Sequence, residues 1–369
     1  VRMVRLPVVL FCMLCAWRIV AASAIDSLMA ALSDREKIGQ MILVYHSPYE
    51  FLREYNVGGV LIMSSMLKDP GALAREIKAA QERMPIGLLV TIDQEGGKVN
   101  RLSHLADRIP ASSARELAAM SLDSIEQQAA AIALQLKALQ VNVNLAPVLD
   151  PSRNWKGEET FMSVRERSFG RGYKDILPPA RAFVRGFSRH GIMCIAKHFP
   201  GYDVYTNSDE AIAVSGADST AVYEHIKIFD AAIGDLGGIL MSSIHFSAFS
   251  KKPAVFSEKM VGLARRICGD KLVVTDDLWG TALRSFVSQG KNLGSAHYPD
   301  ADFAQLVSMA FWAGNDLLMI TYPEKVRIIQ QTLLRLVTQD PLARQRMDES
   351  VRRVLIAKQT LGLLVSPHQ

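Results

Sequence analysis

Eight short apolar segments, spread along the whole chain, limit the possible folds more than any other feature. Each is rich in branched side chains and apolar at nearly every position, as expected of strands buried on both faces. They cover Met41–Tyr45, Val57–Met63, Ile86–Ile92, Val141–Ala146, Gly191–Ala196, Gly238–Ser243, Leu272–Thr275 and Asp316–Ile320. Amphipathic stretches separate them. Eight strands close a parallel barrel, so the sequence predicts a single-domain α/β fold, a (β/α)8 TIM-type barrel.

Helix start signals fall between these segments. Ser-x-x-Glu capping pairs begin at Ser33 and Ser113, and Ser257 is a further N-cap. The Ser113 pair precedes a long Ala/Leu/Gln-rich segment, and residues 348–361 are expected to form a last helix of the outer ring. The competing fold is a doubly wound open sheet. That fold would place a glycine-rich phosphate-binding turn after the first strand, and this sequence has none.

The first 24 residues have the pattern of a secretory signal peptide. Arg2 and Arg5 precede the apolar run Leu6–Trp17, and small residues at positions 22–24 give a cleavage site. The run is short for a membrane span, and Arg18 interrupts it. We therefore expect an exported protein, periplasmic or secreted, whose catalytic barrel comprises residues 25–369 and has no stable membrane insertion. An uncleaved N-terminal anchor is the alternative.

Charge and cysteine content exclude several classes. The formal charge of +5 falls to +2 without the N-terminal 24 residues, which hold three arginines and no acid. Such a small charge gives no reason to expect a nucleic-acid partner. Outside the signal segment the cysteines are Cys194 and Cys268, which excludes a disulfide scaffold. Because Cys194 lies in an apolar strand, a buried free thiol is expected.

Polar residues gather where five of the predicted strands end. These are Asp93-Gln94-Glu95, then Asn144 and Asp150, Lys197-His198, His245, and Asp276-Asp277. In a parallel barrel all of these positions lie on one rim, where active sites are built. Charges are costly to bury without partners, so the rim is expected to bind something polar. Although two histidines lie there, no His/Asp/Glu set has ligand spacing on one element, so we predict no metal and no cofactor.

Five ordered motifs carry a resemblance to a known family. They are Ile92–Arg101, Leu145–Asp150, Arg167–Gly170, Lys197–Gly201 and Thr275–Leu278. Together they resemble family 3 glycoside hydrolases, and are most similar to the single-domain β-N-acetylglucosaminidase (β-hexosaminidase) branch. The resemblance extends from about Glu36 to Leu361. It implies a retaining exo-glycosidase that hydrolyses terminal β-linked N-acetylglucosamine, from cell-wall fragments or glycans, through a covalent glycosyl-aspartate. A β-glucosidase of the same family is the alternative enzyme.

The resemblance also assigns roles to individual residues. Asp276 matches the nucleophile of the family, whereas Asp277 is expected only to cap a helix. The residues expected to hold the non-reducing sugar are Asp93, Arg101, Arg167, Lys197 and His198. These types suit the task, because a carboxylate accepts from hydroxyls and Lys or Arg donates to sugar oxygens. A salt-bridge network that only stiffens the rim is the alternative.

The loop after the Pro-Gly turn departs from that branch. There, an Asp-Ser-His triplet supplies the general acid/base; here Ser208, Asp209 and Glu210 stand in its place, and Tyr202 replaces the histidine that usually follows Pro-Gly. Three interpretations remain open. Glu210 acts as a direct acid with its pKa raised by burial; Asp209 does so after a small loop shift; or the protein is a catalytically reduced sugar binder. His297 is a remote further candidate.

Overall fold

Eight parallel strands surround a single axis in the order β10-β1-β2-β3-β4-β5-β7-β9. The computed structural model describes residues 24–291, 294 and 297–364. The strands are β1 Ile42–Tyr45, β2 Gly59–Ile62, β3 Leu89–Ile92, β4 Val143–Asn144, β5 Met193–Phe199, β7 Gly238–Met241, β9 Leu272–Val274 and β10 Leu318–Ile320. Every one falls within, or overlaps, an expected segment. The proposed signal peptide lies outside the described residues except for Ala24, so it stays a prediction.

The first strand along the chain, β1, pairs with the last one, β10. Ile42 to Val44 of β1 pair with Leu318 to Ile320 of β10. The remaining gap is closed by a bridge between Val274 and Leu317. The ladder of parallel strands is thus nearly continuous around the ring, which confirms the barrel.

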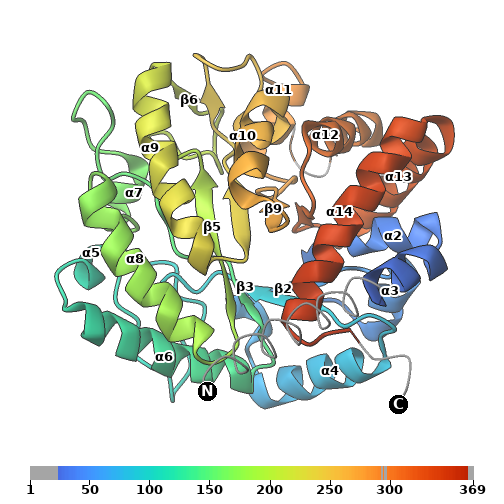
Figure 1. Ribbon diagram of the computed structural model, residues 1–369, viewed down its shortest axis with the longest axis horizontal. Coiled ribbons are helices and arrows are strands. Elements are labelled where there is room, and N and C mark those ends of the chain that lie inside the picture. The colour runs from blue at the N-terminus through green and yellow to red at the C-terminus, as the bar shows by residue number, and fades with distance from the viewer. Residues whose placement is uncertain (1–23, 292–293, 295–296, 365–369) are drawn as a thin grey trace, which may run out of the picture.

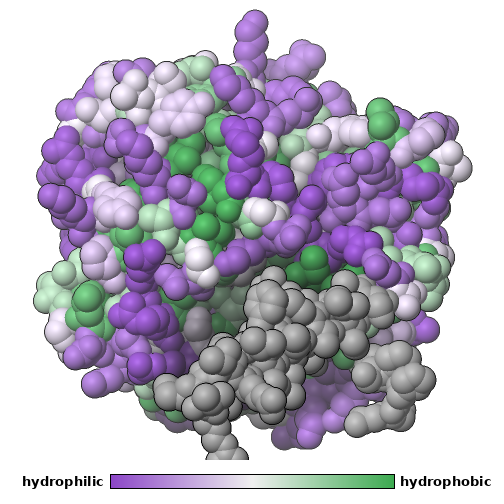
Figure 2. All heavy atoms as spheres, viewed as in Figure 1, coloured by the Kyte–Doolittle hydropathy of each residue, from purple (hydrophilic) through white to green (hydrophobic). Residues whose placement is uncertain are grey.

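Helices surround the strands, with α6, α8, α9, α10, α13 and α14 visible around β2, β3, β5 and β9 (Figure 1). Their bounds are α2 Asp34–Gln40, α3 Tyr49–Tyr55, α4 Pro70–Arg83, α5 Ala114–Leu117, α6 Leu122–Ala138, α7 Phe161–Val164, α8 Tyr173–Ser188, α9 Ser219–Ala232, α10 Glu258–Cys268, α11 Thr281–Val287, α12 Asp300–Ala313, α13 Val326–Gln339 and α14 Pro341–Thr360. Hydrophilic side chains cover most of the face seen in Figure 2. Within the described ranges, no helix has the length and apolar character needed to cross a membrane.

The helix caps agree with the sequence at all three predicted serines. Ser33 and Glu36 form a complete capping box at α2, and the Ser257 side chain accepts from Met260 N at α10. The box at Ser113 begins only the four-residue helix α5, whereas the long helix α6 has its own N-cap at Ser121. The segment after Ser113 thus contains two helices, because a second serine cap follows a turn. The last helix also begins earlier than expected, at Pro341.

Two apolar layers position the strands. Inside the barrel the packed side chains include Leu43, Leu61, Leu89, Leu240 and Val274, and α14 contributes Val354 and Ala357 to this cluster. The larger layer lies between strands and helices. Cys194 and Cys268 are free and buried, as expected for Cys194. A small parallel pair, β6 Val214–Ser215 with β8 His245–Phe246, was not expected from the sequence.

Candidate active site

A cavity of 510 Å³ lies at the carboxyl ends of the barrel strands. Its lining includes all eight side chains that the sequence assigned to chemistry or sugar binding: Asp93, Arg101, Arg167, Lys197, His198, Asp209, Glu210 and Asp276. These residues come from five separate stretches of sequence, and the barrel brings them to one mouth. His297 is exposed and is not among the residues that line this cavity.

The segment after β3 supplies two of the carboxylates. Side chains alternate along extended backbone, so Asp93 and Glu95 point to the same side and Gln94 to the other. Gln94 is buried, and its side-chain oxygen accepts from Arg101 N at 2.8 Å. Its backbone N–H donates to Asn144 Oδ1 at 3.0 Å, and its carbonyl accepts from the same amide at 3.0 Å. Gln94 thus fixes the loop that carries the acids.

Lys197 joins the two acids from the opposite side of the cavity. Its Nζ lies 2.5 Å from Asp93 Oδ1 and 2.6 Å from Glu95 Oε1. Arg167 holds Glu95 by two parallel bonds, of 2.8 Å from Nε and 2.9 Å from Nη2. Arg101 Nη2 lies 3.4 Å from Asp93 Oδ2. We call Asp93, Glu95, Arg167 and Lys197 the rim cluster.

Mutual pairing keeps the rim cluster ionised despite its burial. Burial alone would raise the pKa of Asp93 and Glu95, but the neighbouring cations outweigh it and hold both pKa values below their usual range. Burial would likewise lower the pKa of Lys197, yet the two carboxylates raise it. The cluster therefore presents fixed acceptors and donors to the cavity at neutral pH.

His198 is oriented by a carboxylate that no sequence motif had assigned. Asp150 has no exposed surface; its Oδ2 lies 2.6 Å from His198 Nδ1, and its Oδ1 accepts from His198 N at 3.0 Å. A carboxylate only accepts hydrogen bonds, so Nδ1 carries the proton. That leaves Nε2 as the nitrogen available for a ligand.

Asp276 follows β9 and faces the cavity between two donors. Ser243 Oγ donates to its Oδ2 at 2.8 Å, and Asp277 N donates to its Oδ1 at 2.9 Å. Asp277 instead ties β9 to the segment after β10, accepting from Thr321 N at 3.0 Å and from Thr321 Oγ1 at 2.5 Å. Burial raises the pKa of Asp277 to about 6. The neighbouring acids thus have different surroundings, but Asp277 does not cap a helix as expected, because α11 begins after Gly280 without a side-chain cap.

The loop after the Pro-Gly turn is held by Tyr202. This buried phenol donates to Thr206 O at 2.7 Å and accepts from Ser208 N at 2.7 Å. From the other side, Ala282 N of α11 donates to Ser208 O at 3.2 Å. The residue that replaces the usual histidine therefore fixes the position of the two loop acids.

The two loop acids differ in their contacts. Glu210 is exposed, and its Oε1 accepts from Asn207 Nδ2 at 3.0 Å. The burial that a direct acid at Glu210 requires is not present. Asp209 is exposed as well. Desolvation by the surrounding protein and the charge of Asp276 nevertheless raise its pKa. Of the two, Asp209 has the surroundings expected of a proton donor.

Sequence reasoning missed three residues of this site. Glu95 lies in a quoted motif, and its spacing of two from Asp93 would have placed both on one face. Asp150 was noted only as the end of a strand. Nothing in the sequence marked Ser243, which approaches Asp276 only in the folded barrel. Among the described residues no group of three or more His, Cys, Asp or Glu is arranged to hold a metal ion.

Comparisons with known sequences all point to one family of glycoside hydrolases. The family model described as the glycosyl hydrolase family 3 N-terminal domain matches residues 33–357. A β-hexosaminidase of Haemophilus ducreyi is 28% identical over 288 residues, covering 75% of this chain and 78% of that protein. One from Glaesserella parasuis is 26% identical over 254 residues, covering 64% and 72%.

Solved structures give the same result. A family 3 β-N-acetylglucosaminidase from Paenibacillus is 27% identical with a TM-score of 0.78, covering 92% of this chain but only 64% of that one. A β-N-acetylhexosaminidase from Beutenbergia cavernae is 24% identical with a TM-score of 0.75, covering 89% of this chain and 99% of that one. Because its sequence identity is so low, the Beutenbergia cavernae structure supports the fold alone.

Proposed function

Since the chain belongs to glycoside hydrolase family 3, we propose that it is a retaining exo-glycosidase that removes terminal β-linked N-acetylglucosamine. The observation that carries this proposal is the position of Asp276. Its carboxylate lies in the same cavity as the rim cluster and is fixed by Ser243 and by its own neighbour's amide. An oriented carboxylate opposite fixed donors suits attack on a bound sugar.

The proposed reaction has two steps. Asp276 attacks the anomeric carbon while the bond to the leaving oxygen breaks. A carboxyl group of the loop after the Pro-Gly turn gives that oxygen its proton. Water then displaces Asp276 from the anomeric carbon and loses its proton to the same loop carboxylate. Meanwhile Lys197 and Arg167 donate to sugar hydroxyls, and Asp93 accepts from them. Their mutual pairing lets these groups do so without changing protonation.

We propose Asp209 as the proton donor, ahead of Glu210. A raised pKa keeps a carboxyl protonated closer to neutral pH, and the charge of Asp276 contributes to that rise. When Asp276 becomes covalently bound its charge disappears, so the pKa of Asp209 falls as the enzyme needs a base. Glu210 is the second candidate. His198 is committed to Asp150 through one nitrogen and is assigned to sugar binding.

The N-acetyl preference is taken from the β-hexosaminidase names of the relatives. A β-glucosidase is the alternative enzyme, because no side chain of the cavity is shown to contact an acetamido group. The export pattern of the N-terminus favours cell-wall fragments or external glycans as the source. The absence of the usual acid/base pair favours one further function, a sugar-binding protein with reduced turnover.

A screen of 4-nitrophenyl glycosides tests the enzyme. We expect turnover of the N-acetyl-β-glucosaminide, and a slow fluorosugar that keeps the acetamido group should label Asp276. If neither this glycoside nor the β-glucoside is cleaved while the folded protein binds free sugar, the sugar-binding alternative holds instead. Label on any side chain other than Asp276 contradicts its role as nucleophile.

Two leaving groups identify the acid. Asp209→Asn should slow a disaccharide substrate about 10²–10⁴-fold, and slow the 4-nitrophenyl glycoside much less, because a good leaving group needs little protonation. Glu210→Gln is the matched control and should change both rates by less than about 3-fold. If Glu210→Gln slowed the disaccharide strongly and Asp209→Asn did not, Glu210 would be the proton donor.

A further inference from the structure

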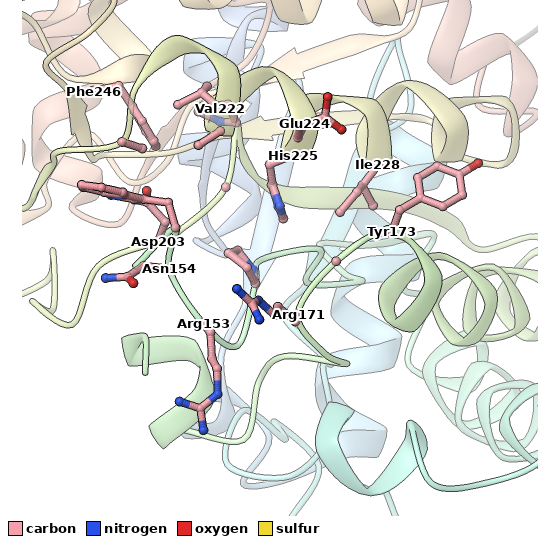
Figure 3. A pocket seen from close by; sticks show the side chains of 17 residues that line it. Arg153, Asn154, Arg171, Tyr173, Asp203, Val222, Glu224, His225, Ile228 and Phe246 are labelled. Atoms are coloured by element: carbon pink, nitrogen blue, oxygen red, sulfur yellow. The ribbon is translucent and has the colours of Figure 1, made fainter. Parts of the chain in front are cut away.

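A second cavity, of 310 Å³, is lined by residues that do not line the catalytic one (Figure 3). Pro200, Gly201 and Asp203 line this outer cavity, whereas His198 and Tyr202 line the catalytic cavity. The turn after β5 is therefore a partition with a cavity on each side. Nothing in the proposed reaction uses the outer side.

His225 of α9 forms the inner wall of the outer cavity and points into it (Figure 3). It packs on Gly201, where an added Cβ would lie 2.5 Å from His225 Cδ2. Its Nε2 lies 2.9 Å from the carbonyl of Leu149. Because a carbonyl only accepts, Nε2 is the protonated nitrogen, and Nδ1 of the neutral ring is an acceptor. Nδ1 has no hydrogen bond to any residue of the described ranges.

Two charged side chains of opposite sign accompany His225. Asp203 accepts from Ser215 Oγ at 2.7 Å through Oδ2, while its Oδ1 is buried without a partner. Arg171 lines the same cavity as His225 (Figure 3), and its guanidinium makes no ion pair with the described part of the chain. The cavity thus offers unused acceptors together with an unused cationic donor.

The apolar part of the wall includes an exposed aromatic face. Trp155 is 48% exposed, with Lys156 Nζ 4.9 Å from its ring centroid. Trp155 also lines an adjoining hollow of 650 Å³, together with Tyr205, which is 67% exposed. Large exposed aromatic side chains are costly to leave in water and commonly mark binding surfaces.

These groups together select a class of ligand. Two acceptors require a ligand that donates hydrogen bonds, and Asp203 repels a phosphate. A purely apolar ligand would leave the polar groups unpaired, while Arg171 disfavours a cation. A neutral ring bearing hydroxyls satisfies all of them, because its C–H face packs on the indole and its hydroxyls both donate and accept. We propose that the outer cavity is a second carbohydrate-binding site, which holds a hexose ring against Trp155 beside His225, Asp203 and Arg171.

Binding of β-1,4-linked N-acetylglucosamine tetramer to full-length protein tests this site. The choice of this probe rests on the proposed function. Lys197→Met, which weakens sugar binding in the catalytic cavity, provides the background. Titration calorimetry should still detect the tetramer in Lys197→Met, and adding Trp155→Ala should raise the Kd at least tenfold. Trp312→Ala is the matched control, an exposed tryptophan on α12 remote from both cavities in sequence, and should leave the Kd within twofold. No binding to Lys197→Met, or equal binding with and without Trp155, overturns the proposal.

Two further measurements keep the interpretation unambiguous. Trp155→Ala alone should leave kcat and KM for the 4-nitrophenyl glycoside within twofold, since the aryl monosaccharide occupies only the catalytic cavity. Arg171→Ala, an exposed substitution, should weaken tetramer binding at least threefold, and an unchanged Kd would count against the site even if Trp155→Ala failed to fold. If wild type lacks turnover yet Lys197→Met binds the tetramer through Trp155, the enzyme proposal fails while the outer site stands.

Discussion

Both ends of the barrel hold a buried carboxylate surrounded by basic side chains, and the two arrangements differ in what the cations face. Asp316, just before β10, has no exposed surface and contacts Arg265, Arg353 at 3.2 Å and Ser350 Oγ at 3.0 Å. Arg265 lies on α10 and Arg353 on α14, so this cluster fastens two helices to a strand. At the other end, the rim cluster joins two strand ends and faces an open cavity.

The difference teaches how to recognise a site. Burial and ion pairing are common to both ends and therefore do not distinguish them. The rim cluster differs in facing the catalytic cavity from two strand ends, where Lys197 has donors and Asp93 has lone pairs that other residues do not fully use. We therefore expect substitutions at the rim to affect chemistry first, and substitutions around Asp316 to affect folding first.

The largest expected effect separates two adjacent acids. Asp276→Asn removes the nucleophile and should lower kcat on the order of 10⁴-fold or more while leaving the unfolding midpoint nearly unchanged. Asp277→Asn, the control, loses part of its bonding to Thr321 and should destabilise the fold by about 1–2 kcal/mol. Initial rates and urea unfolding measure both. Equal loss of turnover in the two variants would contradict a catalytic role for Asp276 and a structural role for Asp277.

The next pair compares the two ends directly. Asp316→Asn leaves arginines without their counter-charge and should lower the free energy of unfolding by about 3–5 kcal/mol, with kcat/KM of the folded protein unchanged. Lys197→Met should also destabilise the fold, because it leaves Asp93 and Glu95 less well paired, but in addition kcat/KM should fall about 10–100-fold through lost sugar contacts. Normal kinetics in folded Lys197→Met would make the rim cluster structural, like that at Asp316.

The pH dependence of stability gives a third, smaller contrast. The pKa of Glu95 is lowered by its cations, so its stabilisation is present above pH 4.5, its unperturbed value, and is lost as the pH falls. The pKa of Asp277 is raised from 3.8 to about 6, so its contribution is present below pH 3.8 and lost as the pH rises through about 6. Urea unfolding from pH 3 to 8 should show Asp277→Asn lacking a decline on the order of 2 kcal/mol. An unaltered profile would contradict the burial assigned to Asp277.

The smallest effect concerns the loop brace. Tyr202→Phe removes the hydroxyl that joins Thr206 O and Ser208 N, at a cost of about 1 kcal/mol in stability. Because Tyr202 positions Asp209 rather than touching the reacting atoms, kcat for a disaccharide should fall about tenfold with KM unchanged. The 4-nitrophenyl glycoside should be affected less. A uniform rise in KM for both substrates would mean that the hydroxyl serves sugar binding instead.

The fold was readable from the sequence because parallel strands buried on both faces give continuous apolar runs. All eight strands lie where such runs occur. The pair β6 and β8 has two residues in each strand and leaves no such run. The capping box at Ser113 is present but begins only a four-residue helix, which shows that a cap marks where a helix starts and not how long it is.

The site was readable only where residues follow strands. The position of each strand end places Asp93, Lys197 and Asp276 at one mouth. Contacts such as Ser243 with Asp276 depend on how neighbouring strands are staggered, which no local pattern records. The choice between Asp209 and Glu210 likewise required the folded loop. Both acids are exposed and adjacent in sequence, and what distinguishes Asp209 is a pKa raised by desolvation and by the charge of Asp276.

The pairing of β1 with β10 fixes when the barrel can form. Asp34 of α2 pairs with Arg344 of α14, and Gln40 accepts from the buried Lys358, so the N-terminal elements have partners near the other end of the chain as well as in β2. During synthesis β1 has an unpaired edge until more than 270 later residues have been added. Closure of the barrel is thereby postponed until the last strand has been synthesised, and this pairing of distant segments is of the kind that slows folding.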